Sequence, residues 1–341
     1  MTASPAAPQH GPDVVLGGMT VRSVPLTGVV LLNMGGPDAL NAVRPFLFRL
    51  FSDRELIPLP AGAVTQPVFA YLVAALRARK VREYYREIGG GSPIGTLTEN
   101  QRAALEKALR ATGGNFRVYV GMRYWHPLSK HAALEMKDDG VTHAIALPLY
   151  PQYCRATTGS SLKDLRRWLH WAGCSFPVTE VRSYPEHPKY VAALAETVSR
   201  TIGGIDREGM FLLFSAHGVP QALIDGGDPY RAETEATVAA VMKSFPGIPH
   251  ALSWQSRAGR AVWLSPDTVD EVTRLARERV RTLVVVPVSF VSDHIETLHE
   301  LDIRLAAHAR EMGIKSFLRA PALNDSPAFI DALKDIVLQT T

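Results

Sequence analysis

The chain has 341 residues, of which 46% are hydrophobic and 21% are charged, and its formal net charge is +4. These values are typical of a globular protein with room for two domains, and they exclude a disordered or fibrous chain. No long basic run interleaved with aromatic residues is present, so we expect no nucleic-acid partner. The two cysteines cannot supply the four thiolates usual for an iron–sulfur cluster, and they indicate a reduced, cytoplasmic protein.

The first 25 residues are expected to form a flexible tail. They contain Pro, Ala, Gly and Ser, and they lack the basic and apolar segments of a secretory signal. No apolar run reaches the roughly 18 residues needed to span a bilayer.

Strands and helices are predicted to alternate along the rest of the chain. Strands are expected at 28–33, 117–121, 143–149, 178–181, 210–214, 250–254, 283–288 and 316–319. Helices are expected at 67–86, 98–111, 162–171, 190–202, 230–243, 267–280 and 328–338. This alternation predicts an α/β protein with two parallel sheets, each covered by helices. We place the domains at 26–176 and 177–324, and we expect a C-terminal helix in 325–341 to pack back on the first domain.

Glycine-rich turns follow the first strand and the first helix. Gly35 and Gly36 lack the G-x-G-x-x-G spacing, so we reject a dinucleotide-binding loop. Gly89–Gly91 follow a helix, which argues against a phosphate-binding loop and favours a tight turn that presents Ser92. The polar run 157–161 is expected to cap the helix that follows it.

The helix predicted at 67–86 is apolar in its first half and basic after Leu76. Such a helix could rest on a membrane or form the lip of a hydrophobic cleft. A core helix with a solvated end fits the same pattern equally well.

The strand at 283–288 leads into a segment rich in acidic residues and histidines. Glu296 and Glu300 would share one face of a regular helix, with His299 close by. His294 and Glu296 would diverge there, unless a π-bulge or an irregular first turn brings them together. A solvated helix face with ordinary charges is the alternative interpretation.

A second strand, 210–214, ends in Ser215, His217 and Gly218. Ligands of parallel α/β sheets bind outside the carboxyl ends of the strands. His217 and Glu296 both stand at such ends, so we expect them to face one shared cleft.

The motifs that carry these residues resemble the ferrochelatases. They are LLNMGGP (31–37), IGGGSPI (88–94), MRYWHPL (122–128), YPQY with TTGSSL (150–162), SAHGVP (215–220), GDPY (227–230), WQSRAG with WLSP (254–266) and SDHIETLHELDIR (292–304). The resemblance implies two Rossmann-like domains around a porphyrin cleft. It also implies insertion of Fe2+ into protoporphyrin IX, which releases two protons and gives protohaem in the last step of haem biosynthesis.

The resemblance assigns roles residue by residue. His217 resembles the essential histidine, as a metal ligand or as the base for the pyrrole protons, and Glu296 resembles its acidic partner. The residues implied as a proton or metal relay are Asp293, His294 and Glu300. Those implied to line the macrocycle are Met34, Arg123, Tyr124, Tyr150 and Trp263, and those implied to meet the propionates are Arg77, Lys80 and Ser92.

The chain departs from the family pattern in places. Animal members carry a cluster held by cysteines in a carboxyl-terminal extension that this sequence lacks, so we predict Fe2+ as substrate and no iron–sulfur cluster. Cys154 stands next to the family's cysteine position, which is Arg155 here, and Arg260 stands where proline is expected.

Alternative functions share parts of this pattern. They are a coproporphyrin or cobalt chelatase of the same fold, and a protein that holds a tetrapyrrole or metal without chemistry. We expect a monomer or homodimer with peripheral contact to the inner membrane face through the 67–86 region.

Overall fold

The computed structural model describes residues 13–16, 19–22, 24–57, 59, 61–257, 259 and 261–341. Strands β1 (Asp13–Leu16) and β2 (Met19–Arg22) pair as an antiparallel hairpin, where we expected a flexible tail. Residues 1–12 of that tail lie outside the described residues.

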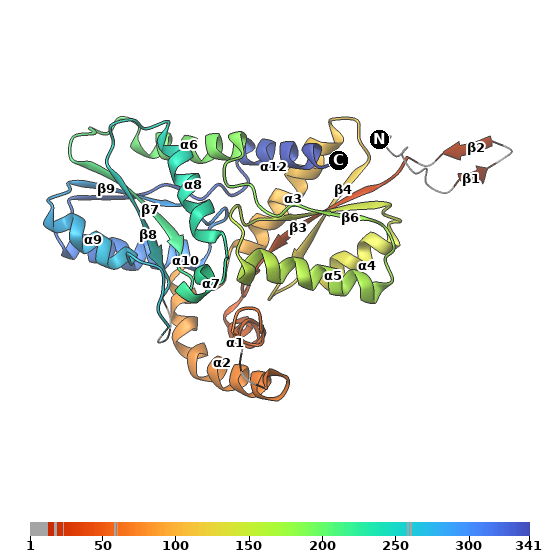
Figure 1. The fold of residues 1–341 in the computed structure, drawn as a ribbon, viewed down its shortest axis with the longest axis horizontal. Helices are drawn as coiled ribbons and strands as arrows, with labels where there is room; N and C mark the ends of the chain where they lie inside the picture. Colours follow the sequence, from red (N-terminus) through yellow and green to blue (C-terminus); the bar gives the residue numbers. More distant parts are fainter. Residues whose placement is uncertain are drawn as a thin grey trace.

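Two four-stranded sheets, parallel throughout, form the body of the protein (Figure 1). The first has the order β4-β3-β5-β6, and the second has the order β10-β9-β7-β8. The strands of the first sheet are β3 (Thr27–Asn33), β4 (Phe116–Met122), β5 (His143–Pro148) and β6 (Val178–Glu180). Those of the second are β7 (Met210–His217), β8 (His250–Gln255), β9 (Thr282–Pro287) and β10 (Ser316–Arg319).

Helices connect the strands of each sheet and cover it, as the alternating pattern predicts. Those of the first half are η1 (Leu40–Ala42), α1 (Val43–Phe51), α2 (Gly62–Glu87), α3 (Ile94–Arg110), α4 (Ser129–Asp138), η2 (Arg155–Gly159) and α5 (Ser160–Ala172). Those of the second are α6 (Pro188–Ile202), α7 (Gln221–Asp225), α8 (Tyr230–Met242), α9 (Thr268–Arg277), α10 (Ile295–Leu298), η3 (Glu300–Leu305), α11 (Ala306–Glu311) and α12 (Pro327–Gln339).

The polar run before α5 does not cap the helix with its side chains. It forms a π-helical turn, η2, that runs directly into α5, and the helix start has no side-chain cap. The expectation of a hydroxyl cap was wrong, because the backbone enters α5 already helical, with Gly159 at φ −59° and ψ −46°.

One hydrophobic cluster spans both sheets, and each sheet has a further cluster on its other face. Leu31 of β3 and Phe214 of β7 belong to the same buried cluster, together with Phe329 and Leu333 of α12. Each such side chain contributes roughly 1.5–3 kcal/mol when it leaves water. Helix α12 packs against α6 and α3. The domain boundary near residue 177 stays a prediction.

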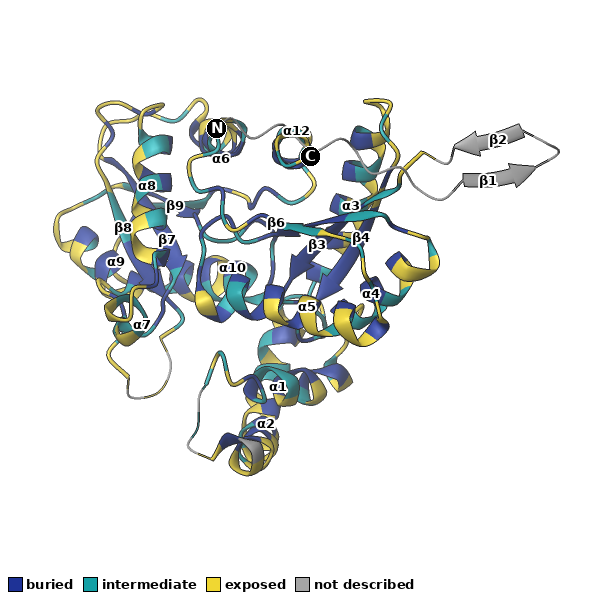
Figure 2. Cartoon of the chain, turned by 45° about the vertical axis from the view of Figure 1, so that its right-hand side comes forward, coloured by how far each residue is buried: buried dark blue, intermediate teal, exposed yellow. Residues whose placement is uncertain are grey.

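Helices α1 and α2 project beyond both sheets (Figures 1 and 2), and we call them the lip. Ala70, Ala74 and Ala78 form the buried stripe of α2, whereas Leu72 and Leu76 are exposed. Alanine lets α2 approach α1 closely, so the large apolar side chains are left on the outside. The surface-helix interpretation is therefore confirmed, and the core-helix alternative is wrong.

Candidate active site

The carboxyl ends of the second sheet bring the site together. In the parallel register, the Cα of His217 at the end of β7 pairs with that of Gln255 at the end of β8. The His217 amide donates to Ser289 Oγ (2.9 Å) in the loop after β9. Three strand ends therefore converge on His217, as expected for the edge of a parallel sheet.

His217 and Glu296 lie in direct contact. His217 Nδ1 is 2.9 Å from Glu296 Oε2, and His294 Nε2 is 3.6 Å from the same oxygen. His294 precedes α10 in an extended conformation (φ −161°), and π-helical η3 begins soon after it. The irregular start is what brings His294 and Glu296 together, so the prediction of a distorted helix is confirmed.

The pKa values of this pair are displaced in opposite directions. Burial alone would lower the pKa of His217, but the Glu296 carboxylate outweighs it and raises that pKa above the usual value. Burial alone would raise the pKa of Glu296, but His217 and His294 outweigh it and lower that pKa. Each partner therefore stabilises the charged form of the other, so a proton that His217 accepts is held more firmly than on a free histidine.

Glu300 is the second carboxylate of the site. Its Oε2 accepts hydrogen bonds from Gln255 Nε2 (3.1 Å) and Ser256 Oγ (2.6 Å). Burial, reinforced by the charge of Glu296, raises the pKa of Glu300. The two carboxylates thus differ: Glu296 is held ionised, and Glu300 takes up a proton more readily.

Asp293 is surrounded by donors from its own loop and from the chain after β10. Its oxygens accept from Arg319 Nη1, Thr297 Oγ1 and Asn324 Nδ2, each at 2.9 Å. These bonds give Asp293 a structural part in shaping the segment that carries His294. The relay role expected for Asp293, His294 and Glu300 stays a prediction.

His299 turns away from the two carboxylates, so our expectation that it converges with them was wrong. It pairs with Glu87 of the lip (Nε2 to Oε2, 3.2 Å), and its ring lies 4.2 Å from that of Tyr84. Helix α10 and η3 are thereby joined to α2. His299 stands between the end of α10 and the start of η3, and its side chain is held by these contacts with α2.

Four of the five residues expected to line the macrocycle lie together: Met34, Arg123, Tyr124 and Tyr150. Tyr124 is buried and donates to Asp53 Oδ2 (2.7 Å), and Arg123 Nη2 lies 2.9 Å from the same oxygen. Met34 packs in the lip cluster that also contains Tyr124. Burial raises the pKa of Tyr150 well above the usual value.

Trp263 lies beside the segment that follows β7. Its backbone pairs with that of Pro220 in an isolated antiparallel bridge, in the loop after β7. Arg260, the departure noted nearby, lies outside the described residues.

The residues expected to meet the propionates lie on the lip and the glycine loop. Arg77 and Lys80 are exposed, over the rings of Phe51 and Tyr84, each at 5.7 Å. Ser92 donates its amide to Pro37 O (2.7 Å).

The two glycine-rich turns pack against each other. A Cβ on Gly36 would lie 2.7 Å from Ser92 Oγ, and one on Gly91 would lie 2.4 Å from Asp38 O. Larger residues would therefore force the two turns apart. Sequence reasoning found both turns but missed this contact, and it also missed Asp53, which no motif signals.

Within the described ranges, no group of three or more His, Cys, Asp or Glu side chains could hold a metal ion. His217 and Glu296 offer two donors. A pair of this kind suits an ion that passes through better than one that stays.

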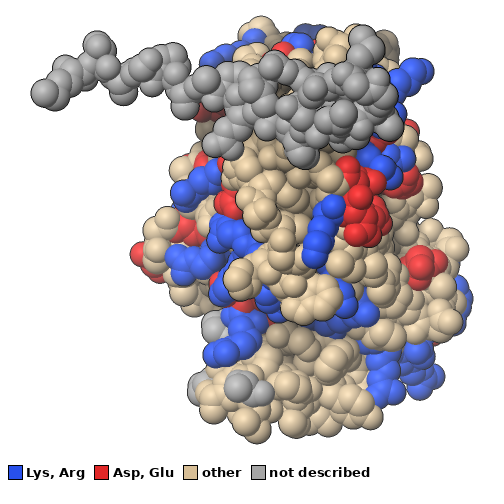
Figure 3. Space-filling view, turned by 90° about the vertical axis from the view of Figure 1, so that its right-hand side faces the viewer, with Lys and Arg blue, Asp and Glu red and all other residues tan. Residues whose placement is uncertain are grey.

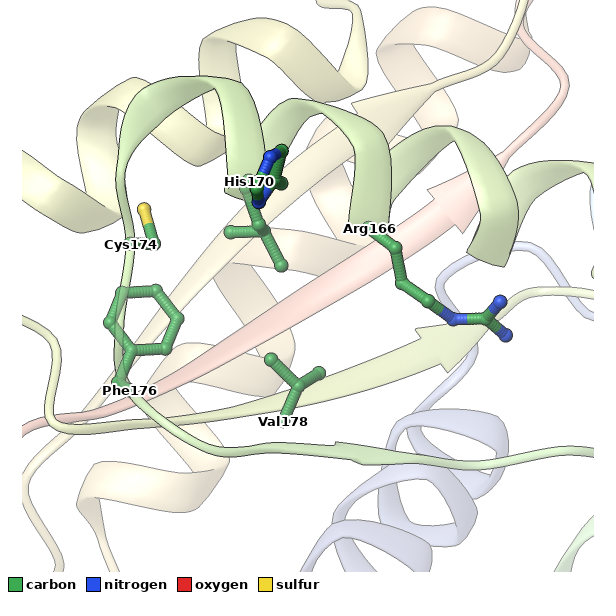
Figure 4. A pocket seen from close by; sticks show the side chains of 6 residues that line it. Arg166, His170, Cys174, Phe176 and Val178 are labelled. Atoms are coloured by element: carbon green, nitrogen blue, oxygen red, sulfur yellow. The ribbon is translucent and has the colours of Figure 1, made fainter.

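A surface pocket lies between α5 and β6 (Figure 4), with a volume of about 220 Å³. Its lining comprises Arg166, Leu169, His170, Cys174, Phe176 and Val178, none of which belongs to the predicted site. On the face shown in Figure 3, basic and acidic side chains both occur, with uncharged surface between them.

Residues 26–341 match the family model described as Ferrochelatase. The chain belongs to the ferrochelatase family. It is 49% identical to the ferrochelatase of Geotalea daltonii over 91% of this chain and 97% of that protein. It is 46% identical to the ferrochelatase of Gloeobacter violaceus, over 92% and 97% of the two chains.

The ferrochelatase family is an enzyme family that inserts metal into porphyrin in haem biosynthesis, so this chain is an enzyme that forms nitrogen–metal bonds. Solved structures add evidence on the fold. SirB from Bacillus subtilis, solved with Fe3+, superposes with a TM-score of 0.56 at 11% identity, over 92% of this chain and 95% of that one. CbiX, the terminal enzyme of sirohaem biosynthesis in denitrifying bacteria, superposes with a TM-score of 0.51 at 13% identity, over 92% and 99%. These likenesses establish a chelatase fold.

Proposed function

We propose that this ferrochelatase inserts Fe2+ into protoporphyrin IX, with His217 as the base and Glu296 as the residue that stabilises its protonated form. The 2.9 Å contact between His217 Nδ1 and Glu296 Oε2 carries the proposal. Because Nδ1 is bonded to Glu296, Nε2 on the opposite side of the imidazole is the atom available to a pyrrole proton. The carboxylate orients the ring and compensates the positive charge that forms on it.

Metal insertion requires a change in the shape of the porphyrin. A flat macrocycle hides its nitrogen lone pairs, and a bent one exposes them to the metal, so binding energy can drive the reaction. Each turnover releases two protons. A histidine of raised pKa accepts a proton readily, and Glu300, whose pKa is also raised, could pass it on.

The direct test is anaerobic addition of Fe2+, or Zn2+ as a surrogate, to the protein with protoporphyrin IX, while the metalloporphyrin spectrum is recorded. We expect rapid conversion by the wild type and a loss of roughly 10²–10⁴-fold in His217→Ala, as is usual when a general base is removed. His308→Ala is the matched control, since this histidine lies on α11 beside Thr273. Binding of protoporphyrin IX without conversion by the wild type would refute it as the substrate, and coproporphyrin would be tested next.

Metal binding separates the two roles of His217. If His217→Ala binds Zn2+ as tightly as the wild type while turnover is lost, His217 acts as a base only. Weaker binding in the variant would support a ligand role.

Arg77 and Lys80 support protoporphyrin IX as the substrate. Both are exposed, and neither has an acidic partner among the described residues. These cations suit the propionates of protoporphyrin IX, and Arg79, between them in the chain, is exposed as well. Coproporphyrin, with four carboxylates, is the substrate to compare, and faster conversion of it would reverse the assignment.

We propose in addition that the lip contacts a membrane surface. Val64, Val68, Leu72 and Leu76 are at least 54% exposed and follow one another at helical spacing along α2, ahead of Arg77. Within the described ranges, no helix has the length and apolar character to cross a bilayer. An apolar stripe beside basic residues suits an anionic surface.

Flotation with vesicles that contain phosphatidylglycerol tests the membrane contact. Leu76→Ser should reduce binding, whereas Leu338→Ser, which removes another exposed leucine on α12, should not. Equal binding by both variants and the wild type would refute the contact.

We also propose that activity requires no iron–sulfur cluster. Cys154 is buried and Cys174 is half-buried, and both are free thiols. The measurement is the sulfide content of active protein, and stoichiometric sulfide would contradict the proposal.

A further inference from the structure

Asp53 lies in the loop between the two lip helices, and it is only 5% exposed. Its Oδ2 accepts from Tyr124 Oη (2.7 Å), Ser160 Oγ (2.5 Å) and Arg123 Nη2 (2.9 Å), and its Oδ1 accepts from Glu55 N (2.9 Å). Four donors on one buried carboxylate fix its position. The loop is thereby joined to the end of β4 and to the start of α5.

The charge of Arg123 is compensated within this network. Its Nε also donates to Ser160 Oγ (2.8 Å), and its side chain is only 20% exposed. The nearest further acid, Asp164, lies 3.7 Å from Nη1 and is itself bound to Arg167 Nη2 (2.6 Å). Arg123 is therefore held by a partner of opposite charge and is not available as a lone cation.

Tyr124 is the second porphyrin-wall residue that Asp53 holds. Burial, with the Asp53 charge added to it, raises the pKa of Tyr124 well above the usual value. The phenol therefore keeps its proton and remains a donor to Asp53. Both side chains that we assign to the porphyrin wall are thus oriented by one carboxylate that lies on the lip.

We propose that Asp53 is a specificity-determining positioning residue, which holds Arg123 and compensates its charge so that the wall presents no unpaired cation to the macrocycle. This inference rests on the proposed function, because it takes Arg123 and Tyr124 as part of the porphyrin wall. A wall in which the charge of Arg123 is neutralised by Asp53 suits a porphyrin whose edges are apolar except for two carboxylates. An unpaired guanidinium there would attract further carboxylates and favour a tetra-acid porphyrin.

The test compares Zn2+ insertion into protoporphyrin IX and coproporphyrin by the wild type and Asp53→Asn. The readout is the ratio of the two kcat/KM values, because a smaller fraction of folded protein lowers both values and leaves their ratio unchanged. We expect Asp53→Asn to shift the ratio toward coproporphyrin by roughly two- to fivefold, the usual effect of exposing one charge to a charged ligand. The double variant Asp53→Asn/Arg123→Gln should return the ratio toward that of the wild type.

Asp139, at the end of α4, provides a matched control because its partners lie on β4. It binds Arg117 Nη1 (2.6 Å) and Tyr119 Oη (2.7 Å), so it repeats the aspartate–arginine–tyrosine arrangement at the opposite end of β4. Asp139→Asn should lower stability without moving the ratio. Arg123→Gln alone leaves Asp53 unpaired and should shift the ratio toward protoporphyrin, which tests the proposal even if Asp53→Asn does not fold.

The outcomes distinguish a failure of the specificity role of Asp53 from a failure of the proposed function. If the wild type converts the porphyrins and neither Asp53→Asn nor Arg123→Gln moves the ratio, the specificity role is wrong and Asp53 only braces the loop. If the double variant keeps the ratio of Asp53→Asn, the charge of Arg123 is not the cause. If the wild type converts neither porphyrin, the proposed function fails, and this inference fails with it.

Discussion

Replacement of Glu296 by glutamine tests the central pair of the site. Glutamine keeps the size of the side chain and removes the charge that faces His217 Nδ1 at 2.9 Å. A hydrogen bond to a charged group is worth about 1.5–3 kcal/mol. We take the lower end, because 37% of the His217 side chain is exposed and solvent screens the pair. A loss of about 1.5 kcal/mol of transition-state stabilisation corresponds to about a tenfold fall in kcat/KM.

The pH profile gives a sharper readout than the rate alone. As a base, His217 must be neutral, so kcat/KM of the wild type should rise with pH through a pKa above the usual histidine value. In Glu296→Gln the opposing effect of burial prevails and lowers the pKa of His217. The acidic limb of the profile should therefore move to lower pH.

The assay is Zn2+ insertion into protoporphyrin IX across the pH range, with Glu300→Gln as the matched control. Glu300 accepts its hydrogen bonds from Gln255 and Ser256 instead of His217, so its loss should move the limb less. Full activity in Glu296→Gln, or an acidic limb at the wild-type pH, would refute the pairing of His217 with Glu296.

Three further predictions concern the rest of the molecule. Leu213→Ala in the buried core of β7 should cost about 2–5 kcal/mol, measured by urea unfolding. Lys80→Glu should raise the KM for protoporphyrin IX with little change in kcat. A fall in kcat as large as the rise in KM would argue against propionate binding. His299 has a pKa that burial lowers despite the opposing charge of Glu87, so the unfolded chain binds the proton more readily and stability should fall as pH drops below 6.5. His126 and His143 have pKa values that burial lowers in the same way, so thermal unfolding of His299→Phe should lose part of that dependence. An unchanged dependence would contradict the assignment.

The sequence by itself determined the helices and strands and the two central residues of the site, His217 and Glu296. Apolar runs of strand length alternate with helical patterns, and this local signal predicts two parallel sheets. Polar residues at the carboxyl ends of such strands must meet at one sheet edge. His217 and Glu296 could therefore be paired from 79 residues apart, and the 2.9 Å contact confirms it.

Tertiary structure alone decided which side chains each polar group meets. Asp53 binds Tyr124 and Ser160, which are 71 and 107 residues away in the chain, and no local pattern encodes such contacts. His299 likewise meets Glu87 and Tyr84 of α2, which lie far from it in the chain, and no local pattern encodes these contacts. Helix α2 buries its alanines and exposes its leucines because α1 packs closely against it, which reverses what hydrophobicity alone would predict.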